Sequence, residues 1–340
     1  MKNHKGLLLA CALSLGVTGG AYASEVELRL SHWLPTQHAL HPTGWIPWSQ
    51  SISEASGGRI SITIYPSQQL GNAVDHYDMA RDGIADITFV NPGYQPGRFP
   101  IAGLGELPFM ITNAKAGSRA FDEWYRAYAA EEMSDVHFCM AFLHTPGTFH
   151  STQPIRVPDD VSGLAVRPAH ASMSRFVGLL GGTSVQVPAP EVRELLSRGT
   201  AQAVSFPWDG VFLFGFQDTV SYHLDLPLYV AMFMMALNKT SYEGMSAEDQ
   251  AVIDEHCTSE WAEKLAYGWA QVEEDGVARM AALEGHELYR PTEEETALWQ
   301  AAAEPLLDAW REDVAAAGHD PDEIFHSFQQ IMRSHNSLVE

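Results

Sequence analysis

The stretch from Val161 to Asp209 most strongly limits what this chain can fold into. Short β-rich runs alternate there with helical patterns, and Gly181 and Gly199 directly follow the two helical patterns. A glycine just past a helix end is a common stop signal, and such alternation is typical of consecutive βα units in a parallel sheet. The β-rich runs are 164–168, 183–187 and 201–206, and the helical patterns are 173–180 and 190–197.

Ligands of such sheets bind at the carboxyl ends of the strands. Arg167 lies at the end of the first β-rich run, and Phe206, Trp208 and Asp209 lie at the end of the third. We therefore predict that a cation, two aromatic rings and a carboxylate converge at one edge of the sheet. For Arg167 the alternative is a structural ion pair, with Asp209 as a candidate partner, and for the rings it is a place in the core.

The chain begins with a pattern that is typical of an export signal. Lys2 and Lys5 precede an apolar run at 7–17, and Ala21-Tyr22-Ala23 fits the small-x-small cleavage rule. This pattern predicts a signal peptide, residues 1–23, that is cut after Ala23. The apolar run is too short to span a membrane.

Cleavage leaves about 317 residues, which exceeds the size at which one core usually divides, so two lobes are expected. The formal net charge of −23 argues against nucleic acid or an anionic membrane surface as a partner, because both attract basic patches.

The first part of the chain adds three strand patterns, at 25–30, 59–65 and 85–90. Trp33 and Tyr94 follow the first and third of these strands, and we expect them to form the opposite wall of a cleft. For Trp33 a position at the edge of the core is equally open. His32 and Asn72, in loops after the first two strands, complete the predicted ligand-binding set.

Further along, residues 229–238 are almost wholly apolar, as in a buried central strand. Such a strand predicts that the chain returns to the first lobe. An apolar stripe with a three-to-four spacing then continues from 246 to 283. It predicts one helix of about 57 Å that braces both lobes. Two further helices are expected, at 293–317 and 321–335.

Two cysteines remain after cleavage, Cys139 in a strand-like run and Cys257 on an apolar helix face. The exported context permits a disulfide, but we expect two separately buried thiols. The sequence contains no CxxC motif and no Cys/His ligand spacing, so neither a metal site nor a cofactor is predicted.

Several short motifs resemble the periplasmic solute-binding proteins of TRAP transporters, of the dicarboxylate-binding type. Their order and spacing carry the resemblance over essentially the whole mature chain. The matching pieces are Tyr65-Pro66 with Gln69-Leu70-Gly71, Gly83 with Ala85-Asp86, Leu107-Pro108-Phe109, Gly163-Leu164-Ala165-Val166-Arg167, Gly199 with the strand after it, and Asn238-Lys239.

The resemblance implies an α/β fold of two lobes around a cleft, joined by a long helix. Lobe I would comprise 24–146 and 233–272, and lobe II 147–232 and 273–340. A periplasmic monomer would close on a solute and deliver it to two integral-membrane subunits. In most members the arginine matching Arg167 forms a bidentate pair with a ligand carboxylate. Many also have an asparagine where this chain has Phe206, so half of that acid clamp is missing here.

The leading hypothesis is therefore transport, with two alternatives for the ligand. A small organic acid would be held by Arg167, and a small amine such as ethanolamine would be held by Asp209 within aromatic rings. A secreted enzyme is the remote alternative. The sequence contains no GxSxG, HExxH, Walker or EF-hand motif to support it. An exported structural or adhesion module, which would lack a ligand cleft, is the third class.

Overall fold

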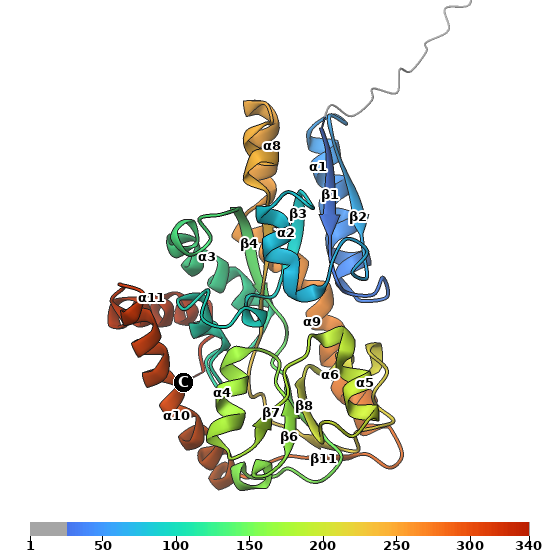
Figure 1. The fold of residues 1–340 in the computed structure, drawn as a ribbon, viewed down its shortest axis with the longest axis vertical. Helices are drawn as coiled ribbons and strands as arrows, with labels where there is room; N and C mark the ends of the chain where they lie inside the picture. Colours follow the sequence, from blue (N-terminus) through green and yellow to red (C-terminus); the bar gives the residue numbers. More distant parts are fainter. Residues whose placement is uncertain (1–25, 340) are drawn as a thin grey trace, which may run out of the picture.

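The computed structural model describes residues 26–339, in which two β-sheets are surrounded by helices (Figure 1). The predicted signal peptide and its cleavage after Ala23 lie outside these residues. The first sheet has the strand order β2-β1-β3-β10-β4. Its strands are β1 (Val26–Ser31), β2 (Ile60–Tyr65), β3 (Ile87–Val90), β4 (His137–Leu143) and β10 (Met232–Leu237).

Strand β10 lies in the interior of the first sheet and pairs antiparallel with both β3 and β4. All six of its residues are buried, because strands flank it on both sides and helices cover the sheet. The prediction of a buried central strand at 229–238 is confirmed. The chain therefore leaves the first sheet after β4, builds the second sheet, and returns.

The second sheet has the order β11-β9-β5-β8-β6-β7, and three of its strands come from the stretch between Val161 and Asp209. Strand β6 (Ala165–Arg167) pairs parallel with β7 (Thr183–Ser184) and with β8 (Ala203–Phe206). Helices α4 (Ala171–Leu179) and α5 (Val192–Ser197) connect them, so the predicted βα units are confirmed. The other strands are β5 (Thr148–Ser151), β9 (Tyr222–Leu224) and β11 (Glu287–Tyr289).

Short helices connect the strands of the first sheet, and one long helix packs against its outer face. Helix α3 buries Phe121, Trp124 and Tyr125 on one side, as its amphipathic pattern requires. The helices of this part are η1 (His41–Trp45), α1 (Ile46–Ala55), η2 (Ala73–Asp75), α2 (His76–Arg81), η3 (Pro92–Tyr94), η4 (Ala102–Glu106) and α3 (Lys115–Glu132). Shorter segments elsewhere are η5 (Pro158–Val161), η6 (Ala189–Glu191), α6 (Trp208–Leu213) and α7 (Lys239–Glu243).

The single long helix predicted from 246 to 283 is wrong in one respect, because two helices share that stretch. Helix α8 (Ala247–His256) ends before Cys257, and α9 (Ser259–Ala281) begins after Thr258. The Thr258 hydroxyl accepts the Trp261 backbone N–H at 3.3 Å, as an N-cap does. The apolar spacing continues through the break, which is why periodicity alone missed it. Helix α9 still contacts α3 and β4 as well as α6 and β11, and so braces both sheets (Figure 1).

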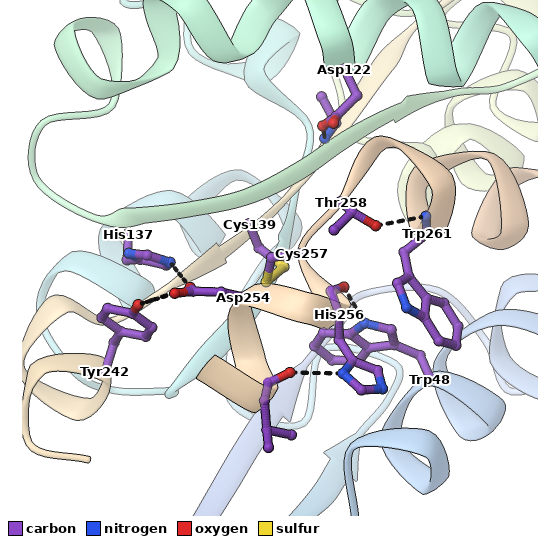
Figure 2. Close-up of a disulfide and its surroundings, with 12 residues drawn as sticks. Trp48, Asp122, His137, Cys139, Tyr242, Asp254, His256, Cys257, Thr258 and Trp261 are labelled. Carbon is purple, nitrogen blue, oxygen red and sulfur yellow. Dashed lines mark hydrogen bonds and ion pairs between the residues drawn. A yellow bond between two sulfur atoms is a disulfide. The ribbon is translucent and has the colours of Figure 1, made fainter. Parts of the chain in front are cut away.

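The two cysteines form a disulfide, contrary to the expectation of separate thiols (Figure 2). Cys139 lies on β4, and Cys257 lies in the break between α8 and α9. The non-helical backbone at Cys257, with φ −108° and ψ 58°, accompanies this change in the expected helix. The bond therefore links the start of the bracing helix to the first sheet.

The last two helices are α10 (Glu293–Ala316) and α11 (Pro321–Ser334), close to the expected bounds. Helix α11 packs on α3, where the Trp124 indole N–H donates to the Ser327 hydroxyl at 3.1 Å. The expected lobe II included this helix, whereas its contacts with α3 place it beside the first sheet. Within residues 26–339, no helix has both the length and the hydropathy needed to cross a bilayer.

Replacing both Cys139 and Cys257 with alanine should lower the free energy of unfolding by about 2–4 kcal/mol. The disulfide closes a loop between residues 118 apart, and losing it lets the unfolded chain gain conformational freedom. Urea titration of the oxidised protein and of the variant measures the difference. Reducing the wild-type protein provides the control, and two free thiols in the native protein by mass spectrometry would contradict the assignment.

Candidate functional site

A cavity lies where the carboxyl ends of strands from both sheets meet. Segments that follow β1, β3, β6 and β8 contribute to its lining, as do β10 and α9. The space among these residues measures about 450 Å³ when the part open to solvent is included, and the cavity itself measures about 40 Å³, so it is narrow in this structure. Four predicted site residues line it, namely Trp33, Tyr94, Arg167 and Phe206.

Arg167 places a buried cation at this cavity, with only 1% of the residue exposed. Its Nε donates to the Val187 carbonyl at 3.0 Å, and Nη1 donates to the Ser205 carbonyl at 3.4 Å. Nη2 donates to the Tyr94 hydroxyl at 3.4 Å. A guanidinium has five N–H groups, so these bonds leave one on each terminal nitrogen. Among residues 26–339, Arg167 forms no ion pair within 4.0 Å, and the suggested pair with Asp209 is not formed.

The Tyr94 hydroxyl lies beside this guanidinium. Its oxygen accepts the Arg167 N–H and also the Ala189 backbone N–H, the latter at 3.0 Å. Because both of these bonds use the oxygen as an acceptor, the O–H proton remains available to another group. Arg167 and Tyr94 together therefore present donors that suit a carboxylate.

Aromatic side chains form much of the remaining wall. The Phe206 ring centroid lies 5.4 Å from the Arg167 guanidinium carbon. The Phe233 and Trp269 ring centroids are 5.2 Å apart, and those of Trp33 and Tyr94 are 5.9 Å apart. Such rings favour a flat apolar ligand body.

Two histidines, His38 and His144, also line the cavity and are neutral. Burial lowers the pKa of His38 to about 3 and that of His144 to about 4. The Leu40 backbone N–H donates to His38 Nδ1 at 3.2 Å, so the ring proton of His38 is on Nε2. His144 Nε2 accepts the Ala231 backbone N–H at 3.0 Å, and its Nδ1 proton faces the Thr145 carbonyl.

The cavity also contains one carboxyl group, that of Glu273 on α9. Its Oε2 accepts the Asp209 backbone N–H at 2.6 Å, and its Oε1 accepts the Trp269 indole N–H at 3.0 Å. Burial raises the pKa of Glu273 to about 8, so the carboxyl is protonated at neutral pH. The charge at this cavity is thus set by Arg167.

Comparison with known proteins identifies the family. The sequence profile described as bacterial extracellular solute-binding protein, family 7, matches residues 30–313. The chain is a TRAP solute-binding protein.

Solved structures of TRAP solute-binding proteins share the fold. One, from Rhodoferax ferrireducens with copurified benzoate, is 30% identical, with a TM-score of 0.86 and coverage of 92% of this chain and 98% of that one. Another, from Bordetella bronchiseptica with bound mandelate, is 27% identical, with a TM-score of 0.85 and coverage of 91% and 99%. A solute-binding protein of Roseobacter denitrificans is 23% identical, covering 85% of this chain and 94% of its own.

Membership of the TRAP family establishes the general role. TRAP solute-binding proteins are periplasmic, bind small-molecule solutes and work with membrane subunits. They are binding proteins and not enzymes. The two sheets and the bracing helix of this chain match the two-lobed structures of the family.

Two residues of the predicted site, Trp208 and Asp209, do not line this cavity. The Trp208 ring packs edge-on against His150, with centroids 5.0 Å apart. The Asp209 carboxylate pairs with Arg279 at 2.6 Å. The cause is that β8 ends at Phe206 and α6 begins at Trp208, so the helical turn carries both side chains away from the cavity. The predicted convergence at this edge is corrected to Arg167 and Phe206.

His32 and Asn72 are likewise outside the lining of this cavity. The His32 ring stacks on Trp45, with centroids 4.1 Å apart, and its Nε2 lies 3.1 Å from His41 Nδ1. Asn72 is exposed, and its side-chain amide donates to Asp75 at 3.3 Å. Both residues therefore serve local structure in this conformation.

Several residues that line the cavity were not predicted from the sequence, including His38, Tyr229, Phe233, Trp269 and Glu273. Trp269 was identified only as part of the apolar stripe of the long helix. Glu273 follows Trp269 by one helical turn, so an acid interrupts that stripe. A carboxyl group on the buried face of a helix was the available signal.

The His144→Gln substitution should make unfolding less sensitive to acid. The folded protein keeps His144 neutral down to about pH 4, whereas the unfolded chain protonates it near pH 6.5, so its stabilising contribution is lost as pH falls through this window. Between pH 7 and pH 5 the wild type should lose about 2 kcal/mol more than the variant. Urea titration at both pH values measures this, with His326→Gln, at an exposed position, as the control. Equal losses in both proteins would contradict the assignment.

Proposed function

We propose that this protein captures an aromatic monocarboxylate in the cavity between its lobes and delivers it to the membrane subunits. The observation that carries the proposal is the Arg167 guanidinium, which is buried and has no counter-ion among residues 26–339. A buried cation is strongly destabilising unless an anion or enough hydrogen bonds compensate it. A ligand carboxylate would supply this anion and would use the two remaining N–H groups as a bidentate pair.

The aromatic wall supports a ring as the body of the ligand. Phe206, Phe233 and Trp269 provide flat apolar surface next to the guanidinium, and the missing asparagine of the acid clamp is replaced by one of these rings. Two similar structures, at 30% and 28% identity, hold copurified benzoate and co-crystallised 3-hydroxybenzoate. The second of these proteins is described as specific for aromatic acid ligands.

A small amine such as ethanolamine has less support from the geometry. Asp209, its proposed anchor, pairs with Arg279 outside the cavity lining. The carboxyl group that does line the cavity, Glu273, is neutral at pH 7. An ammonium group would therefore meet Arg167 without a compensating carboxylate.

We also propose that the protein is exported and that its chain is divided between two lobes. Cleavage after Ala23 would release a mature monomer into the periplasm. Lobe I would contain 24–146 and 233–272, as the membership of β10 in the first sheet supports. Lobe II would contain 147–232 and the segment after 273, apart from α11.

Replacing Arg167 with lysine should weaken benzoate binding by about a hundredfold or more, because an ammonium cannot form the bidentate pair. Calorimetric titration of the purified mature protein with benzoate measures the affinity. The Arg279→Lys variant is the matched control, because that arginine forms an ion pair outside the cavity lining. Its affinity should stay within about threefold of the wild type.

Unchanged benzoate affinity in a folded Arg167→Lys variant would refute the carboxylate pair. If instead ethanolamine raises the melting temperature of the wild type and Asp209→Asn abolishes that shift, the amine is the ligand.

A further inference from the structure

Glu273 is a second polar group at the ligand cavity that binding of a simple carboxylate does not use. The residue is 2% exposed and reaches the cavity from α9. No ion pair within 4.0 Å joins it to Arg167 or to any other described cation. Its position therefore calls for a separate explanation from that of the guanidinium.

The hydrogen bonds of Glu273 leave its carboxyl proton free to bind a ligand. Oε2 accepts from the Asp209 backbone N–H, and Oε1 accepts from the Trp269 indole N–H. A neutral carboxyl group has one O–H donor as well as acceptor capacity, so it can form a hydrogen bond with a ligand hydroxyl. The two existing bonds fix the orientation of the group, because one anchors it to α6 and the other to its own helix.

Two donors belong to the same cavity. The Trp33 indole N–H is buried and has no acceptor among residues 26–339. His38 carries its proton on Nε2, and its ring lies edge-on to Trp269, with centroids 4.8 Å apart. His38 thus lies next to the ring whose N–H binds Glu273. An acceptor and a donor close together match a hydroxyl group, which both donates and accepts.

We propose that the Glu273 carboxyl forms a hydrogen bond with a hydroxyl group of the bound aromatic acid, so that the protein selects hydroxylated aromatic monocarboxylates over unsubstituted ones. This inference rests on the proposed function, because Arg167 has to hold the carboxylate first. The hydroxyl oxygen in turn accepts from His38 or Trp33. Glu273 is then the residue that determines specificity, while Arg167 provides charge recognition.

The ionisation of Glu273 is compatible with an anionic ligand. Burial raises its pKa to about 8, so at pH 7 the carboxyl is neutral and does not repel the ligand carboxylate. A site built to hydrogen-bond a hydroxyl discriminates strongly against the analogue that lacks it, because the buried polar groups are then left unpaired.

Calorimetric titration of the wild type with benzoate, 3-hydroxybenzoate, 4-hydroxybenzoate and 3-methoxybenzoate tests the inference. At least one hydroxybenzoate should bind about tenfold or more tightly than benzoate. If that ligand is 3-hydroxybenzoate, 3-methoxybenzoate should lose the advantage, because methylation removes the hydroxyl proton. In the Glu273→Leu variant, whose side chain can neither donate nor accept a hydrogen bond, the preference should fall to about threefold or less, with benzoate still bound. Because this comparison is a ratio between ligands, a general loss of affinity in the variant does not mimic it.

Glu132→Leu is the matched control. Glu132 is also a buried carboxyl, and it accepts the backbone N–H groups of Ile101 and Ala102 away from this cavity. That variant should keep the hydroxybenzoate preference. The wild-type ligand series stands by itself if Glu273→Leu does not fold.

Failure of this inference and failure of the proposed function give different results. Wild-type protein that binds benzoate as tightly as both hydroxybenzoates overturns the inference and leaves the proposed function intact. A preference that persists in folded Glu273→Leu assigns hydroxyl recognition to another residue and overturns the inference as well. Binding of none of these acids refutes the proposed function itself.

Discussion

The burial of the Arg167 guanidinium is the constraint on which the site depends. A cation removed from water needs hydrogen bonds, and carbonyl groups of Val187 and Ser205 provide two of them. Those carbonyls belong to β8 and to the segment after β7, so the parallel pairing around β6 positions the cation. Neutral groups satisfy part of its hydrogen bonding and leave its charge uncompensated. The fold of the second sheet thus prepares a site for an anion before any anion arrives.

Helix α9 packs closely against neighbouring elements at two glycines, where there is no room for a side chain. A Cβ atom on Gly268 would lie 2.1 Å from the Thr43 hydroxyl, and one on Gly276 would lie 2.7 Å from the Asp209 backbone nitrogen. Contacts this close exclude any larger residue unless a neighbour shifts. Glu273 lies between these two glycines on the same helix. The part of α9 that carries it is therefore held between η1 and α6, and its carboxyl binds the backbone of α6.

Local patterns in the sequence predicted most strands and helices, because alternation and helix-stop glycines depend on neighbouring residues alone. The short strands β5, β9 and β11 were not predicted. The break between α8 and α9 at Cys257 was not predicted, because the apolar spacing continues across it. The Thr258 N-cap was the stronger signal. Trp208 was expected at the cavity, but helix α6 begins at this residue, just after β8, and turns its side chain away. Arg167 and Phe206 were identified from strand ends. His38 reaches the cavity through tertiary packing, which no local pattern encodes, whereas an acid on the apolar face of α9 was the local signal for Glu273.

The insertion of β10 between β3 and β4 also dictates the order in which the molecule can be assembled. Both neighbours of β10 are synthesised long before it. Strands β5 to β9 of the second sheet lie between β4 and β10 in the sequence. Contacts between residues so distant along the chain slow folding. The amino-terminal half therefore has no complete sheet of its own while the chain is emerging. Its sheet is complete only after the return strand arrives, so the first lobe cannot finish folding before most of the second sheet has been synthesised.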